Sequence, residues 1–181
     1  MSITSFDQDR PAPEVLENWC TSAGQELAIR PVAADDAARE LHFMRSLSPQ
    51  TRYERTFSHR GLMPGELQQL VRFDVRREIA LLAAAGRKPD EEIVAVARLR
   101  KSPDGSQCEF AIVVGDKWQR QGIGARLLGK LLEVAKLAGV RRVTGRTMAT
   151  NQSMKALARK VGFELHPDPD DATVTLLSID L

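Results

Sequence analysis

The stretch QCEFAIVVGDKWQRQGIGARLLGKLLEVAKLAG, from Gln107 to Gly139, joins two kinds of hydrophobic periodicity. As far as Val114 the side chains alternate between two faces, which is typical of a half-buried strand. From Gly122 the apolar residues recur at steps of three and four, as on one face of a helix. Gly139 is placed to end that helix. We therefore predict a strand, a glycine-containing turn and a long amphipathic helix.

The turn before this helix has the features of an anion site. A helix start leaves backbone N–H groups without partners, and Ser, Thr, Asp or Asn usually caps them. None of these types occurs in residues 118–121, whereas Gly122 and Gly124 expose the backbone and Arg120 adds positive charge. This pattern favours phosphate binding over a helix start that only water caps. It is neither a dinucleotide fingerprint, because Leu127 replaces the third glycine, nor a P-loop, because no Gly-Lys-Ser/Thr follows.

The six residues from Gln119 to Gly124, QRQGIG, match the Q/R-x-x-G-x-G/A signature of the GNAT superfamily of N-acetyltransferases. Asn151 and the later pair Gly162-Phe163 resemble the second cofactor segment of that superfamily. The resemblance spans roughly residues 27–181. It implies acetyl-CoA as the acyl donor, with its pyrophosphate held by the loop and the helix start.

The resemblance also implies roles for individual residues. Glu109 is the candidate general base, because the family commonly uses a glutamate on this strand; the alternative is an exposed strand glutamate. Asn151 is either a helix N-cap or a cofactor contact. Many family members carry a tyrosine as general acid where this chain has Ala158. The cofactor residues that the resemblance implies are Ile112, Val113, Val114, Gln119, Arg120, Gln121, Gly122, Ile123, Gly124 and Asn151.

The composition limits the classes of protein to which this chain can belong. A chain of 181 residues with 43% hydrophobic and 28% charged residues suits one soluble domain with a real core. A net charge of +2 and the lack of a basic run argue against nucleic-acid binding. The two cysteines, Cys20 and Cys108, show no metal-ligand spacing, and no apolar run is long enough for a membrane span. A reducing cytoplasm is the expected compartment, and the sequence predicts no oligomeric state.

The remaining pattern predicts an α/β fold: a GNAT-like mixed, mostly antiparallel sheet of about seven strands, flanked by helices on both faces. Residues 1–26 are expected to be a partly disordered extension with one helical turn near Val15–Trp19, and residues 27–181 a single domain. Ser48 with Pro49 predicts a short helix after the one at 35–45, and another is expected at 64–72. The other expected helices are 122–138 and 151–161, and the expected strands are 27–32, 78–84, 92–100, 107–114, 140–147, 162–165 and 173–179, with a turn at 103–105.

The segment from Ser46 to Phe57 resembles one in the bacterial Pat-type protein lysine acetyltransferases of the superfamily. The leading hypothesis is therefore acetyl transfer to a protein lysine by direct attack of its amine on the thioester. The early helices are expected to form one wall of the site that binds the acceptor. This wall would carry Arg52, Arg55, Arg60 and Arg72. Two alternatives stay open: transfer to a small amine, and a non-catalytic module that senses an acyl-CoA.

Overall fold

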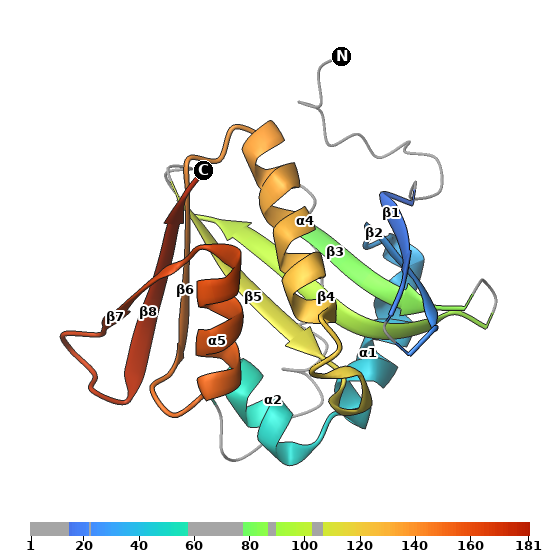
Figure 1. Ribbon diagram of the computed structural model, residues 1–181, viewed down its shortest axis with the longest axis horizontal. Coiled ribbons are helices and arrows are strands. Elements are labelled where there is room, and N and C mark those ends of the chain that lie inside the picture. The colour runs from blue at the N-terminus through green and yellow to red at the C-terminus, as the bar shows by residue number, and fades with distance from the viewer. Residues whose placement is uncertain (1–14, 22, 58–77, 87–89, 103–106) are drawn as a thin grey trace.

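The computed structural model describes residues 15–21, 23–57, 78–86, 90–102 and 107–181. In this part of the chain one sheet has eight strands in the order β1-β2-β3-β4-β5-β6-β8-β7 (Figure 1). The strands are β1 (Glu17–Cys20), β2 (Glu26–Pro31), β3 (Glu78–Ala85), β4 (Glu92–Lys101), β5 (Cys108–Val114), β6 (Arg142–Met148), β7 (Glu164–Pro167) and β8 (Val174–Asp180). The helices are α1 (Ala37–Ser46), α2 (Pro49–Thr56), α4 (Ile123–Leu137) and α5 (Gln152–Val161), with short 3₁₀ turns η1 (Ala34–Asp36) and η2 (Asp116–Trp118).

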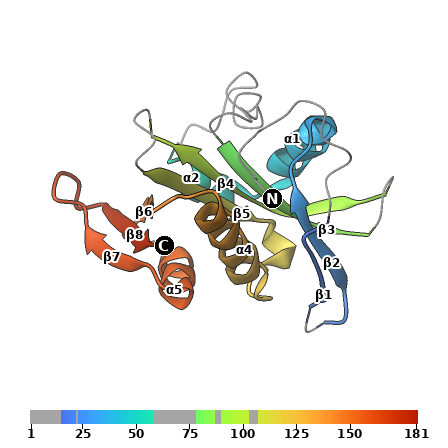
Figure 2. The same ribbon diagram turned by 90° about the horizontal axis from the view of Figure 1, so that it is seen from above.

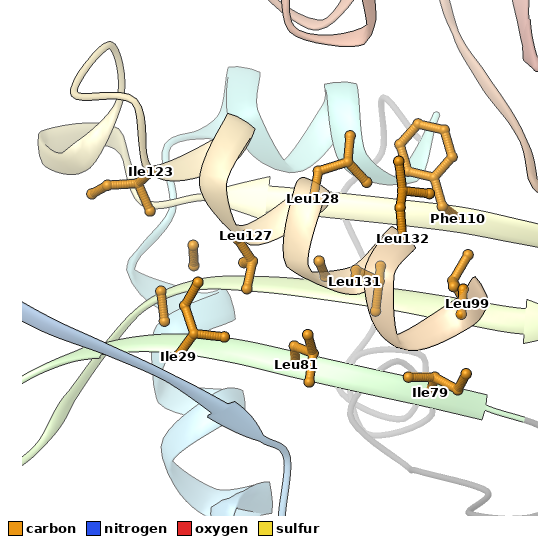
Figure 3. Close-up of a cluster of buried hydrophobic side chains, with 14 of the residues drawn as sticks. Ile29, Ile79, Leu81, Leu99, Phe110, Ile123, Leu127, Leu128, Leu131 and Leu132 are labelled. Carbon is orange, nitrogen blue, oxygen red and sulfur yellow. The ribbon is translucent and has the colours of Figure 1, made fainter. Parts of the chain in front are cut away.

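Helices cover both faces of the sheet, as predicted. Figure 2 shows α1 on one side and α4 with α5 on the other. On the α1 side, Phe43 and Met44 pack in a cluster with Leu82. On the other side, the apolar stripe of α4 lies over β3 and β4, so that Leu127 and Leu131 are fully buried (Figure 3). The main core therefore lies between α4 and the middle of the sheet.

The strands β5 and β6 are paired only where they begin. In parallel register Cys108 lies opposite Val143 and Glu109 lies opposite Thr144, and no further pair follows in these two strands. Figure 1 shows the two strands diverging from this point towards α2 and α5. Meanwhile β4 stays paired with the whole of β5. The edge of β5 that faces β6 is therefore open from Phe110 onward.

Most predicted elements are confirmed, including the parallel pairing of β5 with β6 across a helix. The helical turn predicted near Val15–Trp19 is wrong, because Glu17–Cys20 forms β1 and pairs antiparallel with β2. This pairing covers the outer edge of β2, which would otherwise expose unpaired backbone groups. The sheet thus has one strand more than expected and begins before residue 27.

Some predicted features fall where the chain is not described. The short helix expected at 64–72 and the turn expected at 103–105 lie outside the described residues, as do Arg60 and Arg72. No helix in the described part of the chain is long and apolar enough to cross a membrane.

Candidate active site

A cleft of about 1180 Å³ opens where β5 and β6 separate. One wall is β5 from Glu109 to Val114, whose edge towards β6 is open after Glu109, and the opposite wall comes from β6, β8 and α5. The loop after η2 and the first turn of α4 close one end, and α2 contributes the residues around Thr51 and Arg55. The cleft therefore joins the predicted phosphate loop to the predicted base.

Phe110 packs at the point where the strands part. A Cβ placed on Gly145 of β6 would lie 2.3 Å from Phe110 Cε1, so the ring needs the space that this glycine leaves. The ring is 6% exposed, and its centroid lies 4.8 Å from that of Phe163. Gly145 thus permits a bulky side chain between the strands, directly after their last pair.

The loop between η2 and α4 lines the cleft and has a backbone conformation typical of anion sites. Arg120 and Gly122 have φ values of 60° and 82°, both in the left-handed region. Backbone that alternates in hand gathers successive N–H groups around a concavity that binds anions. Gly122 is the N-cap of α4, and no side chain caps this helix start. The left-handed conformation of Arg120 costs about 1–3 kcal/mol, and such strain is concentrated at ligand sites. The loop therefore fits a phosphate group.

Gly124 allows α4 and α5 to approach closely beside this loop. A Cβ on Gly124 would lie 3.2 Å from Leu157 Cδ2 and 3.5 Å from Val114 Cγ2. At the start of α5, Asn151 Oδ1 accepts a hydrogen bond of 2.9 Å from the backbone N–H of Met154. Asn151 also lines the cleft, so its two predicted roles are compatible.

Asp116 ties α2 to the end of β5. Its carboxylate accepts hydrogen bonds from Ser48 N at 2.8 Å, Ser48 Oγ at 2.7 Å and Thr51 Oγ1 at 2.6 Å. Burial alone would raise the pKa of Asp116, but the hydrogen bonds from Thr51 and Ser48 outweigh it and hold the pKa below its usual range. Gln119 Nε2 adds bonds to Thr51 Oγ1 at 3.3 Å and to Val114 O at 3.2 Å. Helix α2 and the loop that begins at Gln119 are therefore fixed to one another.

Glu109 lies at the last β5–β6 pair and is exposed to the cleft. Arg55, from the last turn of α2, lines the same cleft. Burial and the nearby charge of Arg98 lower the pKa of Arg55 to about 10. The carboxylates of Glu40 and Glu109 oppose this shift, so both are close enough to act on the guanidinium.

A buried ion-pair network supports this region from the α1 side of the sheet. Arg98 Nη2 donates to both oxygens of Glu40 at 2.7 and 2.6 Å, and Arg98 Nη1 donates to Glu78 Oε2 at 3.3 Å. Arg100 Nη2 lies 2.6 Å from the other oxygen of Glu78. Burial raises the pKa of Glu40, although Arg98 opposes that shift. The network holds α1 on the sheet beside the cleft.

The model of the Acetyltransferase (GNAT) family matches residues 39–163 of the chain. The chain belongs to the GNAT acetyltransferase family. Members of this family use acetyl-CoA as the acyl donor, and this GNAT chain is accordingly an acetyltransferase.

Relatives of this GNAT chain are acetyltransferases as well. It is 31% identical over 160 residues to Acetyltransferase PA5475 of Pseudomonas aeruginosa, covering 87% of this chain and 86% of the relative. It is 29% identical over 140 residues to Acetyltransferase Pat of Mycolicibacterium smegmatis, covering 77% of this chain and 41% of that longer protein. The solved GNAT domain of S. lividans PAT superposes with a TM-score of 0.77 at 23% identity, covering 91% of this chain and 96% of that one.

Most of the site residues predicted for this GNAT domain line the cleft. Two do not: the side chain of Ile123 is 1% exposed in the core, and Gln121 lines a second cavity of about 470 Å³ beside β1. The predicted residues that line the cleft are Glu109, Ile112, Val113, Val114, Gln119, Arg120, Gly122, Gly124 and Asn151.

Sequence reasoning missed Asp116 and the contact between Phe110 and Gly145. A glycine inside the β6 pattern is a signal of close approach, because such a glycine weakens a strand unless another group needs its space. Nothing local marks Asp116, whose partners lie far away in the sequence. Ala158, at the position of the usual tyrosine, is fully buried and offers no acid to the cleft.

Proposed function

We propose that this GNAT enzyme transfers the acetyl group of acetyl-CoA to the side-chain amine of a protein lysine, with Glu109 as general base. This proposal rests on one observation: the loop of residues 119–124, the open edge of β5 and Glu109 all line the same cleft. The loop follows the end of β5 and Glu109 lies near its beginning. A donor held by its phosphates and extended along the strand would bring its acyl end towards Glu109.

The donor site is built mainly from backbone. The N–H groups of residues 119–124 would bind the pyrophosphate together with Arg120, helped by the α4 dipole. The backbone of Ile112, Val113 and Val114 would bind the pantetheine arm, as an added strand binds a sheet edge. Acetyl-CoA supplies the thioester carbonyl on which the acceptor amine acts. The open β5 edge and the uncapped helix start both fit this donor.

The acceptor amine needs a base. A lysine amine has a pKa of about 10.4, so forming the neutral amine at pH 7 costs roughly 4.6 kcal/mol. A positioned base typically contributes about 10²–10⁴-fold in rate, which offsets much of this cost. Glu109 is exposed in the cleft, so its carboxylate can take the proton directly or through one water. With Ala158 buried, the leaving thiolate departs unassisted, which suits a thiol pKa of about 8.5.

The charges of the cleft favour a protein lysine over a polyamine. Acids and bases balance along the described lining: Glu54, Glu109, Asp116 and Asp171 face Arg55, Arg120, Arg146 and Lys160. Two of the acids, Asp116 and Asp171, are already engaged by neighbouring hydroxyl and backbone groups. A site for a small polycation would carry an excess of free carboxylates to steer it in. The likeness to the relatives named Pat supports the same choice. The compartment that we propose is the cytoplasm, with which two free cysteines are compatible.

Transfer from labelled acetyl-CoA tests the proposal directly. We expect label on lysine side chains of intact folded proteins, located by mass spectrometry, at a rate above that for spermidine. Efficient acetylation of spermidine without protein modification would overturn the choice of acceptor and favour a small amine.

A further inference from the structure

Arg55 is a cleft residue to which the proposed function gives no role. Within the residues that the structure describes, its guanidinium makes no hydrogen bond or ion pair. The side chain is only partly exposed, and it lines the cleft. A charge removed from water without a partner is costly, so proteins normally pair it. An arginine in the cleft that no described residue pairs therefore favours a counter-ion that arrives with a ligand.

The nearby carboxylates are already engaged. Both oxygens of Glu40 accept from Arg98, and the two oxygens of Glu78 are divided between Arg98 and Arg100. Glu109 attracts Arg55 but, as the proposed base, becomes neutral when it takes the proton of the amine. Proton transfer to Glu109 would therefore remove one of the negative charges that act on the guanidinium.

The phosphates of the cofactor are not the expected counter-ion of Arg55. The loop of residues 119–124 follows the end of β5, whereas Arg55 interacts with Glu109 near the beginning of that strand. Arg55 therefore lies beside the proposed reaction centre, on the α2 wall. The planar fork of a guanidinium matches a carboxylate in a two-bond pairing.

We propose that Arg55 binds a carboxylate of the acceptor, so that the enzyme prefers amines that carry a carboxylate close by. The inference rests on the proposed function, because the acceptor amine must meet Glu109 in the same cleft. Two sources offer this chemistry: the side chain of an Asp or Glu next to the target lysine, and a terminal carboxylate.

Three short peptides with one lysine and blocked N-termini separate these cases. The first has Asp beside the lysine and an amidated C-terminus, the second has Asn instead of Asp, and the third has no acid but ends on the lysine with a free carboxylate. Release of CoA gives kcat/KM for each peptide with the wild type, Arg55→Gln, Arg55→Lys and the control Arg52→Gln. Arg52 lies on the same helix, outside the cleft lining.

We expect the wild type to prefer a carboxylate peptide over the Asn peptide by about tenfold or more. Arg55→Gln should abolish this preference by slowing only the carboxylate peptide, Arg55→Lys should retain part of it, and Arg52→Gln should leave it intact. The melting temperature of Arg55→Gln should not fall, because the variant removes a poorly solvated charge that no described residue pairs. A purely structural role for Arg55 predicts a clear fall instead.

The outcomes are distinct. Preference for the first peptide assigns the carboxylate to a side chain, and preference for the third assigns it to a chain terminus; both support the inference. Equal use of all three peptides by the wild type, or an unchanged preference in Arg55→Gln, overturns the inference while the proposed function stands. If spermidine is acetylated and none of the peptides is, both claims fail. The inference fails because spermidine carries no carboxylate, and the proposed function fails because no lysine is acetylated.

Discussion

Replacing Gly145 by alanine should destabilise the protein through Phe110. The new Cβ would lie 2.3 Å from Phe110 Cε1 and 2.7 Å from Cδ1, whereas carbon atoms in contact lie about 3.5–4.0 Å apart. The ring would have to move by more than about 1 Å, but it is buried and packs against Phe163. Overpacking of this kind costs about 1–3 kcal/mol. For a domain of this size that corresponds to a fall in Tm of about 2–12 °C.

Thermal and urea unfolding measure this cost, and calorimetry with acetyl-CoA measures its effect on the cleft that Phe110 lines. Gly129→Ala is the matched control. Gly129 lies inside α4 with no atom within 4 Å of an added Cβ, so alanine there should be neutral or stabilising by up to about 1 kcal/mol. The cost of Gly145→Ala should also shrink in a Phe110→Leu background, because the ring is removed. A Gly145→Ala protein as stable as the wild type would refute the role given to this contact.

Two further predictions follow from the loop and from the buried ion pairs. Gly124→Glu should weaken acetyl-CoA binding about tenfold or more, because the side chain meets Leu157 and puts negative charge at the proposed phosphate site. Unchanged affinity in calorimetry, relative to the control Gly129→Glu, would remove the loop from cofactor binding. Arg98→Leu should cost about 3–5 kcal/mol by leaving Glu40 buried without its cation. Burial already raises the pKa of Glu40 in the folded protein. A carboxyl group with a higher pKa in the folded than in the unfolded state lowers the stability of the fold as the pH rises above the unfolded-state pKa of about 4.3. Urea unfolding should therefore show a larger Arg98→Leu defect at pH 8 than at pH 5, and an equal defect at both would contradict this.

Local patterns predicted most of the fold, because periodicity and capping signals act over a few residues. The Ser48 cap followed by Pro49 forms as expected, and so do the strand before the phosphate loop and the helix after it. The glycine-containing loop was predictable for the same reason, since its glycines and the missing cap residue lie within a few positions of one another.

Features that depend on distant residues could not be predicted. Asp36 is fully buried and pairs with Arg30 through two hydrogen bonds of 2.6 and 2.8 Å, a contact that no pattern near either residue marks. The pairing of β4 with β3 shifts by one residue, because Val94 lies between Ile93 and Ala95, the partners of Ala84 and Ala83. This shift changes which side chains of β4 face each helix layer. The pairing of β1 depends on the free edge of β2, which no pattern in residues 15–20 reveals.

The central claim is that Glu109 takes the proton of an acceptor amine in this cleft. The most direct measurement is steady-state acetylation of a lysine peptide by Glu109→Gln and wild type between pH 7 and 9.5, with the acetyl-CoA Kd measured in parallel. The claim predicts a turnover lower by about 10²-fold near pH 7, a Kd unchanged by the substitution, and a difference that narrows at high pH as more of the amine becomes neutral. A Glu109→Gln enzyme that turns over at the wild-type rate at pH 7 would contradict it.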